Sequence, residues 1–378
     1  MERGNEQIPS TGLAAVMFMF IVGSSLTVPL AAVAGHDAWI SILLAIAVSC
    51  GIVWVYTTLC QLFPGRSLVE IGSDLFGAWT GRILGLCYAW YSFHLGVLVL
   101  RAFTEFIMMV ALPKTPPLTV SAAMMAIVLW VTYSGVETVC RCSLAILAFV
   151  LLEGIVSMIL MGGNFEAGNL LPIIDRGWSP IVQGMTELVG FPFGETILFA
   201  MIIPHLNKVG QAKRTVIWTL IAAGSLLLLV NLRNTLVLGE LSSRLIYPSY
   251  TAYQYISIAD FIERVEPIVI VTWVTGVFIK LSVCLYVAAN SLSTALAGSR
   301  FRTYLVPLTL LMIEFSRLIY RNNTELIQFA TNVWQWYSVP FQILVPVLLL
   351  LAALFVKRKR NTARRCKEET GSTEAAIE

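Results

Sequence analysis

Ten stretches of this sequence are long and apolar enough to be interpreted as membrane-spanning helices. A span needs about 20 mostly apolar residues, and lipid offers no hydrogen-bond partners to a peptide backbone, so each stretch is expected to be helical. Of the 378 residues, 57% are hydrophobic and only 12% are charged, which is typical of an integral membrane protein. The predicted spans are 9–33, 37–62, 79–112, 117–135, 140–162, 181–205, 214–238, 266–297, 302–319 and 334–356.

The distribution of lysine and arginine predicts the orientation of these spans. Most of the 25 basic residues fall on segments that share one side if the N-terminus is cytoplasmic, and basic residues favour that side. We therefore expect a cytoplasmic N-terminal tail at 1–8, a transmembrane domain at 9–356, and a cytoplasmic tail at 357–378 that is first basic and then acidic. Acidic Glu2 and Glu6 argue against a cleaved signal sequence.

The loop 163–180 divides the ten predicted spans into two groups of five. An odd number of spans in each half gives the halves opposite orientations, so any repeat, about 9–162 and about 181–356, must be inverted. No residue-level repeat is evident, and the prediction rests on hydropathy. The predicted fold is an all-α integral membrane domain with a five-plus-five inverted repeat.

The first span of each half is interrupted at its middle. One interruption follows Gly23 and contains two serines and Pro29, and the other is the glycine-, phenylalanine- and proline-rich segment 190–195. Broken helices expose N–H groups that suit a carboxylate and carbonyls that suit an ammonium, and paired breaks indicate the substrate site of many transporters. The alternative is that the small residues serve helix packing. The predicted substrate-binding residues are Gly23, Ser24, Ser25, Thr27, Gly190, Phe191, Phe193, Gly194 and Glu195.

Charged side chains inside spans form a second set of candidates, because they need partners or water in a membrane. The predicted intramembrane charge network consists of Arg101, Glu105, Glu153 and Lys280. Arg101 and Glu105, four residues apart, form either a structural ion pair or part of a pocket. Lys280 could replace a bound sodium ion, carry a proton, or form a salt bridge with Glu153. Glu195 could cap its half-helix, and it could do so and still face the ammonium of a ligand.

No enzymatic function is predicted. The sequence contains no phosphate-binding glycine loop followed by Lys-Ser/Thr, no Gly-x-Ser-x-Gly and no His-Glu-x-x-His. Most of the seven cysteines lie within apolar spans, and no histidine pair accompanies Cys140 and Cys142. We therefore assign no cofactor, metal or disulfide.

Two segments resemble the spore germination permease family, the B subunits of nutrient germinant receptors. They are Tyr247-Pro248-Ser249-Tyr250 with its continuation through 255–264, and Gly194-Glu195 followed by Met201-Ile202-Ile203-Pro204. The resemblance extends over essentially the whole membrane region. It implies a LeuT-like fold of the amino-acid/polyamine/organocation transporters, with helices 1 and 6 unwound at mid-membrane. It also implies an amino-acid carboxylate held by Gly23, Ser24 and Ser25, and a second contact region at 190–195.

The same resemblance implies a spore inner-membrane location, an A subunit and a lipoprotein C subunit as partners, and no contact with nucleic acid. Three functions remain open from the sequence. The chain could sense a nutrient, most simply an amino acid, and signal to its partners; it could transport an amino acid with a proton; or it could be a passive conduit for water or ions. The identity of the nutrient does not follow from the residues.

Overall fold

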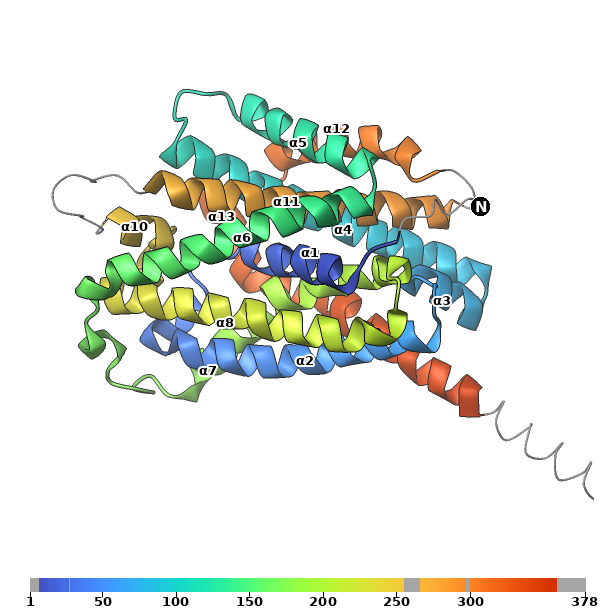
Figure 1. Cartoon of the computed structure of the whole chain (residues 1–378), viewed down its shortest axis with the longest axis horizontal. Coiled ribbons are helices and arrows are strands. Elements are labelled where there is room, and N and C mark those ends of the chain that lie inside the picture. Colours follow the sequence, from blue (N-terminus) through green and yellow to red (C-terminus); the bar gives the residue numbers. More distant parts are fainter. Residues whose placement is uncertain (1–6, 27, 255–265, 297–299, 359–378) are drawn as a thin grey trace, which may run out of the picture.

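The computed structural model describes residues 7–26, 28–254, 266–296 and 300–358. Most of these residues are helical, and no strand occurs among them beyond one isolated bridge between Ile8 and Leu206. The long helices run side by side along one direction of the molecule (Figure 1). The α-helices are α1 (Ser10–Gly23), α2 (Ala38–Leu62), α3 (Leu68–Phe76), α4 (Ala78–Val110), α5 (Pro117–Tyr133), α6 (Val136–Met161), α7 (Trp178–Leu188), α8 (Ala212–Leu238), α9 (Leu241–Arg244), α10 (Pro248–Gln254), α11 (Glu266–Ala295), α12 (Arg302–Leu318), α13 (Asn323–Gln328) and α14 (Trp334–Val339).

Six helical segments are long and apolar enough to cross a bilayer on their own, so the chain is a multi-pass membrane protein. They are 32–62, 78–110, 136–164, 209–238, 266–295 and 323–358. Large apolar side chains on the outward faces, such as Trp130 and Ile159, are more than 70% exposed, which suits contact with lipid. The other four predicted spans correspond to α1, α5, α12 and the broken element that begins with α7. Each of these helices is shorter than 18 residues.

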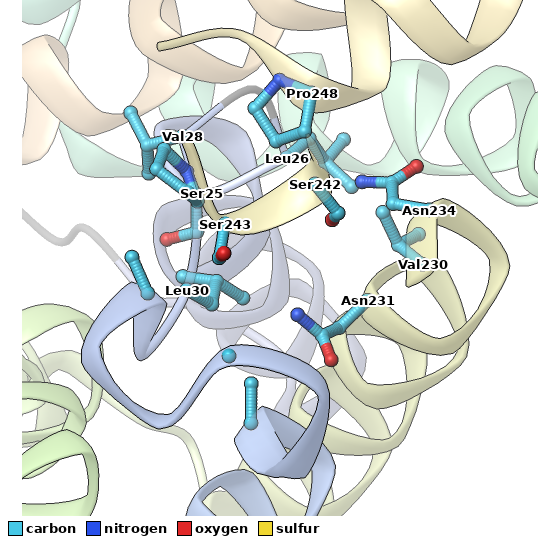
Figure 2. Close-up of a pocket in the computed structure, with 14 residues that line it drawn as sticks. Ser25, Leu26, Val28, Leu30, Val230, Asn231, Asn234, Ser242, Ser243 and Pro248 are labelled. Atoms are coloured by element: carbon cyan, nitrogen blue, oxygen red, sulfur yellow. The ribbon is translucent and has the colours of Figure 1, made fainter. Parts of the chain in front are cut away.

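The first interruption lies directly after α1. That helix ends at Gly23, residues 24–31 form turns where they are described, and a 3₁₀ segment, η1 (Ala32–Asp37), then leads into α2. The predicted span 9–33 implies that a second helical part begins soon after the interruption, near Ser25–Thr27; Thr27 lies outside the described residues, and its described neighbours are not helical. Figure 2 shows this segment facing Asn231 and Asn234 of α8 and Pro248 of α10.

The second interruption separates α7 from a 3₁₀ helix. The segment η4 (Val189–Phe193) contains Phe191 in an extended conformation, with φ −145° and ψ 123°, and η5 (Gly194–Met201) follows it. Pro192 has no N–H to continue the helical hydrogen-bond ladder. The loop predicted at 239–265 contains the short helices α9 and α10, and its part from 255 to 265 lies outside the described residues.

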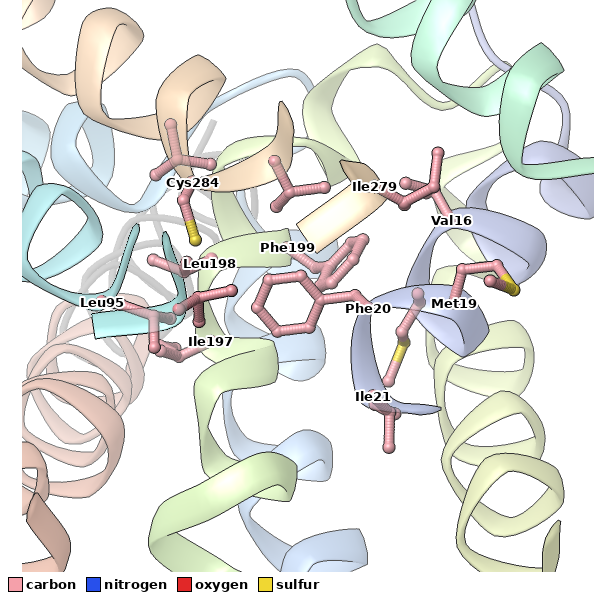
Figure 3. Packing of buried hydrophobic residues seen from close by; sticks show 14 of the residues in the cluster. Val16, Met19, Phe20, Ile21, Leu95, Ile197, Leu198, Phe199, Ile279 and Cys284 are labelled. Atoms are coloured by element: carbon pink, nitrogen blue, oxygen red, sulfur yellow. The ribbon is translucent and has the colours of Figure 1, made fainter. Parts of the chain in front are cut away.

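The buried core is centred on α1, η5 and α11. Every residue of α1 from Ala15 to Gly23 is buried, and α11 packs against α1, α4, α5 and α6. The rings of Phe20 and Phe199 meet edge to face with centroids 5.4 Å apart, and Ile279 of α11 lies beside them (Figure 3). A fully buried, close-packed centre holds the two interrupted elements and α11 in fixed register.

Candidate substrate-binding cavity

A cavity of about 350 Å³ lies between the two interruptions. It is bounded by the segment after α1, α4, the region from the end of α7 into η5, the loop 243–247, α11, and the α13–α14 region. A volume of this size is typical of small-molecule sites. Most of the wall is apolar, with Val28, Leu95, Leu98, Val99, Phe191 and Val277 among the lining residues.

A buried ion pair adjoins this cavity through Glu195, which is one of its lining residues. The Lys280 ammonium donates hydrogen bonds to Glu195 Oε2 at 2.5 Å and to Ser24 Oγ at 2.8 Å, and both charged side chains are completely buried. The rings of Phe20 and Phe191 lie 4.9 and 4.6 Å from the ammonium, close enough for cation–π attraction. One lysine from α11 thus joins the first interruption, at Ser24, to the second, at Glu195.

Three buried polar atoms around the cavity lack a hydrogen-bond partner of ordinary geometry within the described residues: Glu195 Oε1, Trp273 Nε1 and Trp334 Nε1. The Trp334 indole lies close to the Glu195 carboxylate, although the contact does not meet the geometry of an ordinary hydrogen bond. Unsatisfied polar groups are costly in an apolar interior. One unmatched acceptor and two unmatched donors therefore lie in the wall of a cavity large enough for a ligand that carries the complementary groups.

The structure brings three predicted site residues, Ser24, Phe191 and Glu195, to the wall of this cavity. The predicted glycines lie elsewhere, against neighbouring helices. A Cβ added at Gly23 would lie 2.5 Å from the backbone of Gly276 in α11, and one at Gly190 would lie 2.9 Å from Gln335. A Cβ at Gly194 would overlap the side chain of Gln342.

The remaining predicted residues lie behind the cavity. Phe193 is fully buried, and a Cβ at Gly224 of α8 would contact its ring. Ser25 donates a hydrogen bond to the Ile21 carbonyl at 2.8 Å and lines a separate cavity of only about 10 Å³ (Figure 2). Thr27 lies outside the described residues.

Ser249, in the Tyr247–Tyr250 motif, fixes the first interruption from a distant part of the chain. Its hydroxyl donates to the Leu26 carbonyl and accepts a hydrogen bond from Asn234 Nδ2 at 2.9 Å. Tyr247 from the same motif lines the main cavity, and burial raises the pKa of this tyrosine to about 12, so it stays neutral at physiological pH. Sequence reasoning did not assign Ser249, Tyr247 or Trp334 to the site.

The predicted charge network separates into independent pairs. Lys280 pairs with Glu195 and not with Glu153, so the salt bridge considered between Lys280 and Glu153 is wrong. Glu153 instead interacts electrostatically with Arg233. Glu195 also forms no capping hydrogen bond with η5 in the described part of the chain, because its Oε2 accepts from Lys280 and its Oε1 has no partner.

Arg101 and Glu105 form an ion pair of 2.7 Å on α4. Arg101 also donates to the carbonyls of Ser316 and Arg317. Neither side chain of the pair lines the cavity, and these contacts link α4 to the end of α12.

Comparison with known proteins agrees with the resemblance. The family model described as spore germination protein matches residues 7–324. Spore germination protein KB of Bacillus subtilis (strain 168) is 28% identical and aligns over 93% of this chain and 96% of that protein. Spore germination protein A2 of the same strain is 24% identical over 86% of this chain and 88% of that protein. Spore germination protein XB of Bacillus anthracis is 22% identical over 86% of this chain and 91% of that protein.

Solved transporter structures share the fold. Mhp1, a nucleobase-cation-symport-1 family transporter with bound bromovinylhydantoin, gives a TM-score of 0.69 at 14% identity, over 90% of this chain and 78% of that one. A Na⁺-coupled sialic acid symporter gives a TM-score of 0.65 at 10% identity, over 93% of this chain and 90% of that one. MhsT in complex with L-phenylalanine gives a TM-score of 0.55 at 15% identity, over 91% of this chain and 97% of that one. The all-helical, LeuT-like class of the predicted fold is confirmed.

Proposed function

This chain belongs to the spore germination protein family, and from that premise we propose that it is the membrane subunit of a spore nutrient receptor. In this proposal the cavity binds a small nutrient without net charge, most simply an amino acid, and binding triggers germination. The protein lies in the spore inner membrane with both termini cytoplasmic, and an A subunit and a lipoprotein C subunit are its partners. Ten crossings, two of them interrupted at mid-membrane, complete the proposed architecture.

The observation that carries the proposal is the Lys280–Glu195 pair beside unmatched polar atoms. The pair is internally neutral and completely buried, so a ligand with net charge would leave an uncompensated charge in a low-dielectric site. A zwitterion avoids this cost. Its ammonium fits the free Glu195 Oε1, and its carboxylate fits the indole N–H groups of Trp273 and Trp334. The apolar wall accommodates a side chain of modest size.

Binding at this place can act on the conformation of the protein. A ligand shifts an equilibrium only through its different affinity for two states. The cavity is bounded by both interrupted elements together with α11, the loop 243–247 and the α13–α14 region, so a ligand that contacts opposite walls favours the state in which they are close. Partner subunits that rest on those elements would then sense the change.

Lys280 also supports binding without sodium. Its ammonium already occupies the position between Ser24 and Glu195 with hydrogen bonds of 2.8 and 2.5 Å. A fixed cation there provides the charge that a bound sodium ion would otherwise supply. Ligand affinity is therefore expected to be the same in sodium and in choline buffers.

The test is a binding screen on the purified full-length chain in lipid nanodiscs, with amino acids and neutral sugars as probes. We expect at least one to bind the wild type, and Glu195→Gln and Trp334→Phe to weaken that binding. Glu314→Gln is the matched control, because Glu314 is exposed on α12. Unchanged affinity in both cavity variants would contradict the site, and accumulation of the ligand by proteoliposomes would favour a transporter over a sensor.

A further inference from the structure

A histidine and two aspartates gather at one end of the molecule, outside the cavity. His36 and Asp37 lie in η1, and Asp175 lies in the loop before α7. His36 Nε2 is 2.5 Å from the Pro172 carbonyl, 3.3 Å from Asp175 Oδ1 and 3.7 Å from Asp37 Oδ2. One imidazole nitrogen therefore faces three oxygen atoms, and the side-chain donor atoms all lie within 4.8 Å of one another.

The charge in this cluster is not balanced by lysine or arginine. Asp37 is only 2% exposed, and within the described residues neither Asp37 nor Asp175 forms a salt bridge with a basic side chain other than His36. Nearby Arg176 pairs with Glu240 at 3.1 Å. A buried carboxylate without a cationic partner is unfavourable, so the cluster favours a bound cation.

A second observation concerns the other oxygen of Asp37. Asp37 Oδ2 accepts a hydrogen bond from the Ile174 N–H at 3.0 Å, whereas the buried Oδ1 has no hydrogen-bond partner in the described part of the chain. A single proton on His36 Nε2 can serve only one of the surrounding oxygens well. A metal ion bound to the imidazole nitrogen and the carboxylates would satisfy several of them at once.

We propose that His36, Asp37 and Asp175, with the Pro172 carbonyl, bind a divalent transition-metal ion. One imidazole together with carboxylate and carbonyl oxygens suits Zn²⁺ or Mn²⁺ better than the all-oxygen sites preferred by Ca²⁺ and Mg²⁺. The prediction of no metal from the sequence rested on cysteine and histidine spacing. This cluster instead joins residues more than 130 positions apart.

The position of the site gives the metal a structural role beside the cavity. Residues 28–31, which line the cavity, directly precede η1, and the loop 172–175 lies shortly before α7, which leads to Phe191. An ion held by both segments would clamp the outer part of the first interruption to the entry of the second. Metal binding is expected to stabilise the folded protein by linkage.

The experiment uses the full-length chain, purified with an affinity tag that contains no histidine and freed of metal with a chelator. Calorimetric titration with ZnCl₂ should show about one ion per chain and a raised melting temperature. Asp175→Asn and His36→Gln should weaken Zn²⁺ affinity by at least about tenfold. Asp74→Asn is the matched control, since Asp74 is 39% exposed against 36% for Asp175 and pairs with Arg66.

The Asp175→Asn variant is expected to fold, because Asp175 is partly exposed and asparagine has nearly the same size. Wild-type-like Zn²⁺ binding by both cluster variants would overturn the proposal, as would loss of binding in Asp74→Asn to the same extent. A wild type that binds no Zn²⁺ would likewise overturn the proposal. Equal binding of Ca²⁺ would contradict the transition-metal assignment.

Discussion

At the scale of single residues, Lys280 and Glu195 depend on each other because, among the residues that the structure describes, neither forms a salt bridge with any other side chain. Both side chains are completely buried, and their contact of 2.5 Å joins α11 to η5. Removing one member of a buried pair leaves the other charge unpaired, which costs about 3–5 kcal/mol in typical proteins. Replacing both by apolar or neutral groups of similar volume is often close to neutral.

We therefore predict that Lys280→Met lowers the melting temperature of the purified protein sharply, whereas Lys280→Met combined with Glu195→Gln recovers most of the loss. Nutrient binding should stay impaired in both variants. Arg317→Met serves as the control, because Arg317 pairs with Glu314 on an exposed face and such pairs contribute little. If the single and double variants are equally destabilised, the two side chains do not act as a pair.

The prediction for Trp334 concerns its free indole N–H. Trp334→Phe keeps an aromatic ring but removes an unmatched donor in the cavity wall, so affinity for a ligand with a carboxylate should fall by roughly tenfold or more, as for a hydrogen bond to a charged group. Trp336→Phe on the same helix is the control, being 68% exposed. Isothermal titration with the same ligand measures both, and equal affinities in the two variants would remove Trp334 from the site.

Residue types at the site were more predictable than their partners. Ser24, Phe191 and Glu195 could be proposed from the two interruptions, and Lys280 from its charge within an apolar span. The Lys280–Glu195 contact joins residues 85 positions apart, so the rotation of each helix decides it. Trp334 could not be distinguished by sequence from its exposed neighbour Trp336, because both are aromatic residues near the same end of a predicted span.

At the scale of elements, α1 and α11 cross in backbone contact at Gly23 and Gly276. A Cβ at Gly23 would lie 2.5 Å from the Gly276 backbone, which cannot move aside as a flexible side chain can. The close crossing brings Ser24 to Lys280, which lies one turn beyond Gly276 on α11. The Lys280 Nζ and Ser24 Oγ atoms are 2.8 Å apart. Small residues commonly permit such approaches between membrane helices.

We predict that Gly23→Ala separates α1 from α11, lowers thermal stability and weakens ligand binding. Gly51→Ala on α2 is the matched control, since no atom lies within 4 Å of an added Cβ there and alanine favours a helix by up to about 1 kcal/mol. The measurements are melting temperature and ligand affinity in detergent. A Gly23→Ala variant as stable as Gly51→Ala would show that the two helices do not need this contact.

The helix that was expected after the first interruption illustrates a limit of local sequence patterns. Glycine, serine and proline indicated where α1 stops, and the described residues agree, since the helix ends at Gly23. The backbone beyond it is held by Ser249, whose hydroxyl binds the Leu26 carbonyl from 223 positions away. Pro29 further disfavours helical backbone at the residue before it. The glycine, serine and proline pattern and the effect of Pro29 are visible in the local sequence, whereas the contact with Ser249 is not.

At the scale of the whole molecule, the number of membrane crossings depends on how the broken elements traverse the bilayer. The 11 residues of α7 rise only about 17 Å, roughly half of the hydrocarbon core. With η4 and η5 the element continues to Met201 and becomes long enough to cross. If it crosses as one unit, the loop before α7 and the segment after η5 lie on opposite sides of the membrane.

Cysteine labelling tests this arrangement at two matched positions, Gly168 and Gly210. Both have open space around an added Cβ, and they flank the broken element on its two sides. Lys208, Lys213 and Arg214 surround Gly210 in the sequence, so this segment should be cytoplasmic. In a background without the native cysteines, we expect an impermeant maleimide to label Gly168→Cys in intact cells, and Gly210→Cys only after permeabilisation. Labelling of both positions in intact cells would mean that α7 and η5 do not form a single crossing, and the inverted arrangement of the two halves would then be wrong.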